Sequence, residues 1–177
     1  MVRKAGIHEF FPARYPMKLD NAQSIPDIFE VVKEAVQDME GVTRAGLMLG
    51  IAELDEGPDR FIAALHPLGS NIILLNRFPL DRVKEQRPEL YKAYVFHVLL
   101  HEYLHTVGLV EEDQVVPRAI AITRPLFGEE HLATKLAEDI SLLLPFVHYP
   151  VRMRLPEGTR IDLVEGFDRS SSTGYIG

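Results

Sequence analysis

The segment from Pro88 to Gly108, PELYKAYVFHVLLHEYLHTVG, constrains the fold of this chain more than any other stretch. Proline is tolerated in the first turn of a helix, and glycine favours a sharp turn after its end. Between the two, apolar residues dominate, so the segment predicts one long, largely buried helix. Residues 101 to 105 read His-Glu-x-x-His. Because residues four apart share a helix face, His101 and His105 are expected to project side by side.

Two imidazoles one turn apart can bind a single zinc ion, at Zn–N distances of about 2.0–2.1 Å. Glu102 falls on the flank of the same face, where a carboxylate can take a proton from water without ligating the metal. Unpaired polar groups are costly in such an apolar window, and metal binding explains why they are there. The spacing therefore predicts His101 and His105 as metal ligands and Glu102 as the catalytic base.

With Gly108 three residues after His105, the motif reads HExxHxxG and resembles that of the zincin metallopeptidases, with the likeness covering about residues 70 to 111. The resemblance implies an α+β fold, in which an active-site helix and further helices pack on a twisted mixed sheet. It implies one zincin-like catalytic domain over residues 1–177, with 146–177 as an extended C-terminal segment. It also implies a zinc metallopeptidase, a hydrolase with one catalytic Zn²⁺ and a peptide or protein substrate.

A catalytic zinc ion usually has three protein ligands, so the motif leaves one to be found. Glu111 is the leading single residue, because zincins of the HExxHxxGxxH type place their third histidine there. Glu111 could instead only begin the next helix, where a negative charge interacts favourably with the positive end of the helix dipole. The alternative, which resembles the gluzincin branch, takes the ligand from a later helix. His131 is the foremost candidate there, and the others are Glu129, Glu130 and Glu138.

Other polar residues have weaker claims on the site. His97 continues the stripe of His101 and is expected to pack or hydrogen-bond behind the ligands. Tyr149 and His148 are candidates for stabilising an oxyanion, with surface placement as the alternative. Met153 resembles the methionine that lies beneath the zinc ion in metzincins, but this likeness consists of one residue.

Around this helix, local patterns predict a helix over 24–40, capped by Ser24 and Asp27 and ended by Gly41. They predict a buried strand over 42–53 and a hairpin of 60–65 with 71–76. By the zincin resemblance 71–76 is the sheet edge that binds substrate, although an ordinary core hairpin fits equally. The patterns that follow predict a helix over 112–122 limited by Pro117, a loop over 123–128 and a helix over 129–144. The chain from Phe146 onward is expected to be extended, outside the catalytic core, and either to restrain the cleft or to pack on the sheet.

Composition narrows the class of function. The formal net charge of −7 argues against nucleic acid and anionic membranes as partners. The chain has no cysteine, so His and carboxylate side chains must hold any zinc. No run approaches the about 18 apolar residues of a membrane span, and the N-terminus has no apolar secretion signal. The expected location is therefore cytoplasmic. Two alternatives to a peptidase remain. One is a zinc endoribonuclease of the rRNA-maturation type, which binds zinc through H-x3-H-x5-H, and the other is a zincin fold kept as a non-catalytic binding module.

Overall fold

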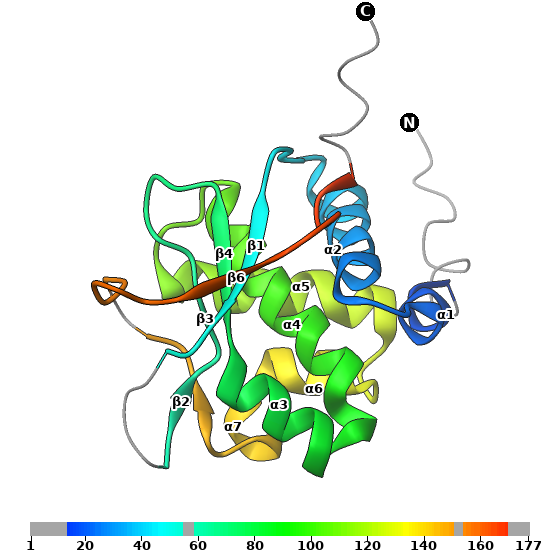
Figure 1. The fold of residues 1–177 in the computed structure, drawn as a ribbon. Helices are drawn as coiled ribbons and strands as arrows, with labels where there is room; N and C mark the ends of the chain where they lie inside the picture. The colour runs from blue at the N-terminus through cyan, green and yellow to red at the C-terminus, as the bar shows by residue number, and fades with distance from the viewer. Residues whose placement is uncertain (1–13, 55–58, 151–153, 170–177) are drawn as a thin grey trace, which may run out of the picture.

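Helices and a small mixed sheet make up the structure, a computed structural model that describes residues 14–54, 59–150 and 154–169 (Figure 1). The helices are α1 (Arg14–Asn21), α2 (Ile25–Glu40), α3 (Arg77–Gln86), α4 (Pro88–Thr106), α5 (Glu112–Phe127), α6 (Leu132–Glu138) and α7 (Ile140–Leu143). The strands are β1 (Met48–Ala52), β2 (Phe61–Ile62), β3 (Ala64–Leu65), β4 (Ile72–Asn76), β5 (Val147–His148) and β6 (Ile161–Val164). The predicted α+β class is thus confirmed.

The larger sheet has the strand order β3-β4-β1-β6. β1 and β4 are parallel, with Met48 opposite Ile72, whereas β3 and β6 are antiparallel to their neighbours. A second, two-stranded sheet pairs β2 with β5. The hairpin of β3 and β4 was predicted, but the expectation that 71–76 forms an edge is wrong. β4 lies inside the sheet, and β3 is the edge strand.

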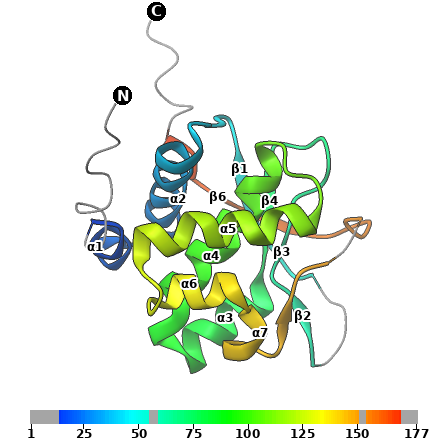
Figure 2. The ribbon, with the colours of Figure 1, turned by 180° about the vertical axis from the view of Figure 1, so that it is seen from behind.

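α4 is the central helix, and side chains all around it are buried. It packs against α2, α3, α5 and α6 and touches β3 and β4. Figure 2 shows α5 and α6 covering the side of α4 that faces away from the sheet. A helix that is apolar on every side belongs in the core, which explains the unbroken apolar run of the motif segment. Of the described helices, none is both long and apolar enough to cross a membrane.

The predicted ends of two helices are confirmed. At the start of α2 the Ser24 side chain accepts a hydrogen bond from the Asp27 N–H at 3.2 Å. Gly41 closes the same helix with a φ of 68°, in the left-handed region where glycine is favoured. α4 begins at Pro88, and Gly108 follows its end with a φ of 115°. This glycine allows the chain to turn back at once toward α5.

Three predicted elements differ from the structure. The strand predicted over 42–53 is reduced to β1, and the helix predicted over 129–144 is divided at Asp139 into α6 and α7. The loop predicted over 123–128 is wrong, because α5 continues through Pro117 and Pro125 to Phe127. Each proline removes one helical hydrogen bond. The buried residues Ala119, Ile122 and Leu126 outweigh that loss by packing α5 into the core.

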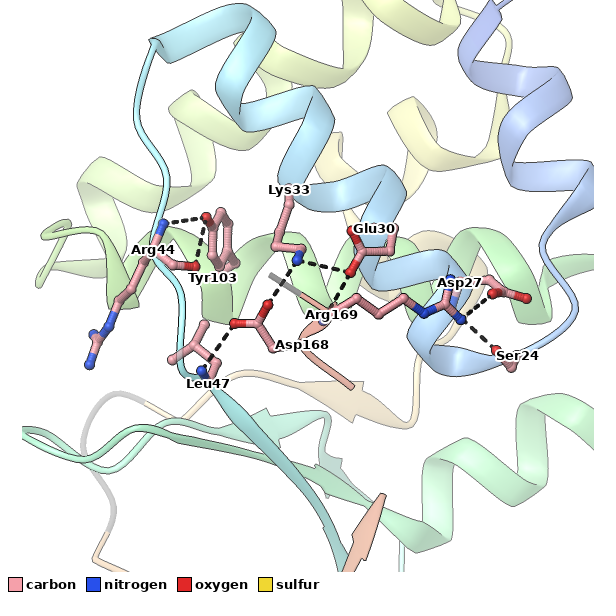
Figure 3. Close-up of polar contacts among 9 residues, drawn as sticks. All are labelled: Ser24, Asp27, Glu30, Lys33, Arg44, Leu47, Tyr103, Asp168 and Arg169. Carbon is pink, nitrogen blue, oxygen red and sulfur yellow. Dashed lines mark hydrogen bonds and ion pairs between the residues drawn. The ribbon is translucent and has the colours of Figure 1, made fainter. Parts of the chain in front are cut away.

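The C-terminal segment is built into the core, so the expectation that it lies outside is wrong. Phe167 is buried and stacks on Phe29 of α2, with ring centroids 4.0 Å apart. The buried Asp168 carboxylate contacts Lys33 Nζ at 2.9 Å and accepts a hydrogen bond from the Leu47 N–H (Figure 3). β6 pairs with β1, at the opposite edge of the sheet from β3. The strand therefore completes the sheet without covering the β3 edge.

Candidate metal centre

Three side chains meet where α4 ends and α5 begins. Glu112, the first residue of α5, places one carboxylate oxygen 2.9 Å from His101 Nε2 and the other 2.9 Å from His105 Nε2. One ligand atom from each residue lies within 4.8 Å of the other two. The turn at Gly108 makes this possible, because it brings the first turn of α5 back against the last turn of α4.

A backbone contact fixes the tautomer of His105. Its Nδ1 lies 2.7 Å from the Leu109 carbonyl oxygen, which can only accept, so Nδ1 carries a hydrogen. In the neutral ring, Nε2 then presents a lone pair to the Glu112 carboxylate. Two electron-rich atoms 2.9 Å apart repel each other unless a cation lies between them, either a proton on Nε2 or a metal ion. Metal-binding histidines typically donate their second ring N–H to a carbonyl in this way.

The pKa shifts follow from the same contacts. Burial alone would raise the pKa of Glu112. The hydrogen bonds from His101 and His105 and the charges of these two residues outweigh burial and lower the pKa to about 2. Burial alone lowers the pKa of His105, whereas its bond to Glu112 and the nearby charges of Glu102 and Glu112 raise it overall. Glu112 is therefore ionised throughout the physiological range. The cluster carries the negative charge that a cation site needs.

Glu102 lines the same cleft but stands apart from this contact. Its side chain is buried, with 3% exposed, and burial raises its pKa even though the charges of His101 and His105 oppose that shift. A carboxylate with a raised pKa beside a polar cluster is a better proton acceptor than an ordinary surface carboxylate. The role of Glu102 as a catalytic base stays a prediction.

The third member of the cluster is Glu112, one residue beyond the predicted Glu111. Glu111 occupies the N-cap position of α5 and lines the cleft without contacting either histidine among the described contacts. His131, the predicted alternative, caps α6 by accepting a hydrogen bond from the Ala133 N–H and packs on Phe127. Glu130 and Glu138 form exposed ion pairs with Lys135 and Arg124, respectively. The position of α5 after the turn at Gly108 determines that Glu112, and not the adjacent Glu111, contacts the two histidines.

Behind the cluster lie the buried His97 and the partly buried Tyr149. Tyr149 stacks face to face on His101, with ring centroids 3.7 Å apart, and meets His97 edge-on at 5.9 Å. Burial lowers the pKa of His97 to about 3, so this imidazole is neutral. His97 lies outside the cluster of His101, His105 and Glu112. His148 pairs with Ile62 through the β5 backbone, and Met153 lies outside the described residues.

A cleft of about 820 Å³ opens over the cluster, a volume in the usual range of ligand sites. One wall comes from the β3 edge and the loop after it, the other from the first turn of α5, and the chain at Pro150 and Arg154 adds to the lining. Besides His105 and Glu112 of the cluster, the described lining residues are Ala64, Leu65, His66, Leu68, Glu102, Val110, Glu111, Asp113, Pro150 and Arg154. His66 was not predicted from the sequence; its signal is a histidine placed directly after a short apolar strand.

Comparisons with known proteins gave no match to a protein family, to a curated protein or to a solved structure. The resemblance to zincins therefore rests on the HExxHxxG motif. The geometry described above is independent of it.

Proposed function

We propose that this protein is a zinc-dependent metallopeptidase that hydrolyses peptide bonds in the cleft over α4. The observation that carries the proposal is the contact of one Glu112 carboxylate with the Nε2 atoms of both His101 and His105. These residue types, two imidazoles and a carboxylate, form the ligand set of many catalytic zinc sites. The buried Glu102 beside them supplies the proton acceptor that hydrolysis needs.

In this proposal His101, His105 and Glu112 hold one Zn²⁺, and Glu112 replaces Glu111 as the third ligand. The fixed Nδ1–H of His105 leaves its Nε2 lone pair for the metal. Bound zinc supplies Lewis acidity, which polarises the scissile carbonyl and acidifies water. The chain contributes two histidines on one helix turn and a carboxylate whose position is set by the adjoining turn.

Glu102 acts as the general base. It takes a proton from the attacking water and returns it to the leaving nitrogen as the C–N bond breaks. Burial favours the protonated form of Glu102 and so makes its carboxylate a stronger acceptor for the proton of the attacking water. The base and the two histidine ligands sit on one helix, α4, which keeps their spacing constant through the reaction.

The substrate in this proposal is a peptide or protein segment that extends along β3. Among the described strands β3 pairs with β4 alone, and its residues Ala64 and Leu65 line the cleft, so the proposal places the substrate along this strand by strand addition. Among the described residues that line the cleft, four are carboxylates, namely Glu102, Glu111, Glu112 and Asp113. An acidic cleft repels phosphates, which disfavours the endoribonuclease alternative. As part of this proposal, the peptidase is placed in the cytoplasm.

The test compares the zinc-loaded parent protein with its Glu102→Gln variant on a peptide library and on total RNA. We expect cleavage of peptides by the parent, loss of cleavage in the variant, and one zinc per chain in both. Glu111→Gln serves as the matched control, because it removes a neighbouring carboxylate from outside the cluster. RNA cleavage that persists in Glu102→Gln, with no peptide cleaved by the parent, would replace the peptidase proposal by the nuclease.

A further inference from the structure

His66 is a second histidine of the cleft, outside the ligand cluster. It follows β3 directly and lines the cleft together with Glu102 and His105. Its Nδ1 lies 2.9 Å from the carbonyl oxygen of Ile72, at the start of β4. This contact ties the imidazole across the hairpin between the two strands.

The tie fixes which nitrogen of His66 carries the hydrogen. A carbonyl only accepts, so Nδ1 is the donor and Nε2 of the neutral ring is an acceptor. Burial lowers the pKa of His66, and the charges of Arg44 and His105 lower it further against the effect of the Ile72 bond. The neutral tautomer with a free Nε2 lone pair is therefore the form at neutral pH.

The second ring nitrogen of His66, Nε2, is not a buried atom. Within the described part of the chain it has no hydrogen-bond partner, and it is not one of the buried unpaired atoms. Because the residue lines the cleft, a molecule bound there can reach this nitrogen. An acceptor in this place calls for a ligand that offers an N–H or O–H group.

The position of His66 in the chain indicates which donor this is. Ala64 and Leu65 of β3 pair with β4 and line the cleft, whereas the residue after His66 is Pro67, which has no N–H. A peptide that adds to β3 therefore loses its regular backbone partners at this point. The His66 side chain offers an acceptor where the strand ends.

We propose that His66 Nε2 accepts a hydrogen bond from a backbone N–H of the peptide substrate, extending the substrate-binding edge of β3 beyond its last paired residue. The proposal rests on the proposed peptidase function, and it assigns a substrate-binding role to a residue outside the HExxH motif. It also predicts a preference for unmodified amides at one substrate position, since a methylated amide has no hydrogen to donate.

The experiment measures binding to zinc-loaded Glu102→Gln protein, which removes the proposed base so that substrate is not consumed. A panel of fluorescein-labelled hexapeptides is screened, and the tightest binder is resynthesised with each amide N-methylated in turn. We expect one methylated position to weaken binding about 3- to 10-fold, as for loss of one net hydrogen bond. Adding His66→Asn should weaken binding of the parent peptide by a similar factor and abolish the penalty at that position.

Asparagine is the informative substitution, because its amide N–H can replace the Nδ1–H bond to Ile72 while nothing replaces Nε2. His66→Gln does the opposite: its amide lies near the position of Nε2, and the hydrogen bond to the Ile72 carbonyl is lost. His131→Asn, at a helix N-cap outside the cleft, is the control and should leave binding unchanged.

Equal methylation penalties with and without His66→Asn would overturn the proposal, and so would a panel from which no peptide binds. A His66→Asn protein that binds every peptide as its parent does, with only His66→Gln weakened, would assign His66 to the hairpin alone. If peptides bind as expected but the unmutated protein cleaves none, the peptidase proposal fails while the role of His66 in peptide binding stands.

Discussion

Tyr149 lies flat against His101, with the two ring planes within 7° and the centroids 3.7 Å apart. Tyr149 comes from the segment that follows β5, whereas His101 belongs to α4. A ring stacked in this way limits rotation of the imidazole and so holds its nitrogens toward Glu112. In the proposed metal centre Tyr149 is thus a positioning residue, which acts on the metal through His101.

We expect Tyr149→Phe to bind zinc as tightly as the parent, because the stack is kept. Its free energy of unfolding should stay equal or rise by up to about 1 kcal/mol, since the Tyr149 hydroxyl is buried without a partner among the described residues. Tyr149→Leu should bind zinc about 10-fold more weakly, as for loss of a supporting contact. Competition with a chromophoric chelator measures both. A Leu variant that matches the parent would remove Tyr149 from the centre.

The identity of the third ligand is tested by the two adjacent glutamates. Glu112→Gln should lower zinc affinity by more than about 100-fold, beyond the 10- to 100-fold typical of outer-shell partners, because it removes a charged ligand. Glu111→Gln should change the affinity by less than about 3-fold, since this side chain contacts neither histidine. Metal content after dialysis and calorimetric titration give the comparison. The reverse order would return the ligand role to Glu111.

The parts of this site that sequence predicts are those with local causes. α4 follows from its apolar content, its initial proline and the glycine after its end, and the pairing of His101 with His105 follows from helical periodicity. The choice of Glu112 over Glu111 depends on how the chain turns between two helices, which no spacing rule contains. A one-residue difference at the start of α5 changes which carboxylate faces the histidines.

The rest depends on contacts between distant segments. His66 and Tyr149 reach the cleft from a hairpin and from the C-terminal part of the chain, so only the tertiary fold places them beside α4. The run of α5 through Pro117 and Pro125 likewise follows from burial of its other face. The two prolines are local helix-breaking signals, but packing of the other residues of α5 outweighs them.

In the metal-free protein, the Glu112–histidine cluster makes stability depend on pH. The pKa of Glu112 is lowered from 4.5 to about 2, so its stabilising contribution is present above pH 4.5 and is lost as the pH falls toward 2. The pKa of His105 is raised above 6.5, so its contribution is present below that pH and is lost as the pH rises through the raised pKa. The two contributions overlap between about pH 4.5 and 6.5.

We therefore expect the parent to exceed Glu112→Gln in free energy of unfolding by the largest margin between pH 4.5 and 6.5, when both proteins are metal-free. The margin should shrink on either side of that range. Urea unfolding across the pH range measures it. With zinc present, acidification should instead weaken metal binding, because protons compete for the ligand nitrogens. A margin that is the same at every pH would contradict the ion-pair arrangement of the metal-free cluster.

The last prediction concerns the buried ion pair between Asp168 and Lys33, which fastens the C-terminal end to α2. The side chains are 1% and 9% exposed, and Asp168 also accepts the Leu47 N–H just before β1 (Figure 3). Replacing Asp168 by alanine leaves a buried ammonium with Glu30 as a remaining partner. Breaking a buried pair costs about 3–5 kcal/mol, and the remaining contact places the expected loss near the lower end, about 3 kcal/mol.

Glu138→Ala, which breaks an exposed pair with Arg124, is the control and should leave the free energy of unfolding nearly unchanged. Truncation after Leu155 should be far more severe, because it removes β6 together with Phe167 and Asp168. Urea unfolding quantifies the two point variants, and circular dichroism scores the truncation. A truncated protein that folds and cleaves peptides faster than the parent would restore the C-terminal segment to the restraining role first expected of it. Loss of folding, the outcome expected from its burial, assigns that segment to the core that holds α4 in place.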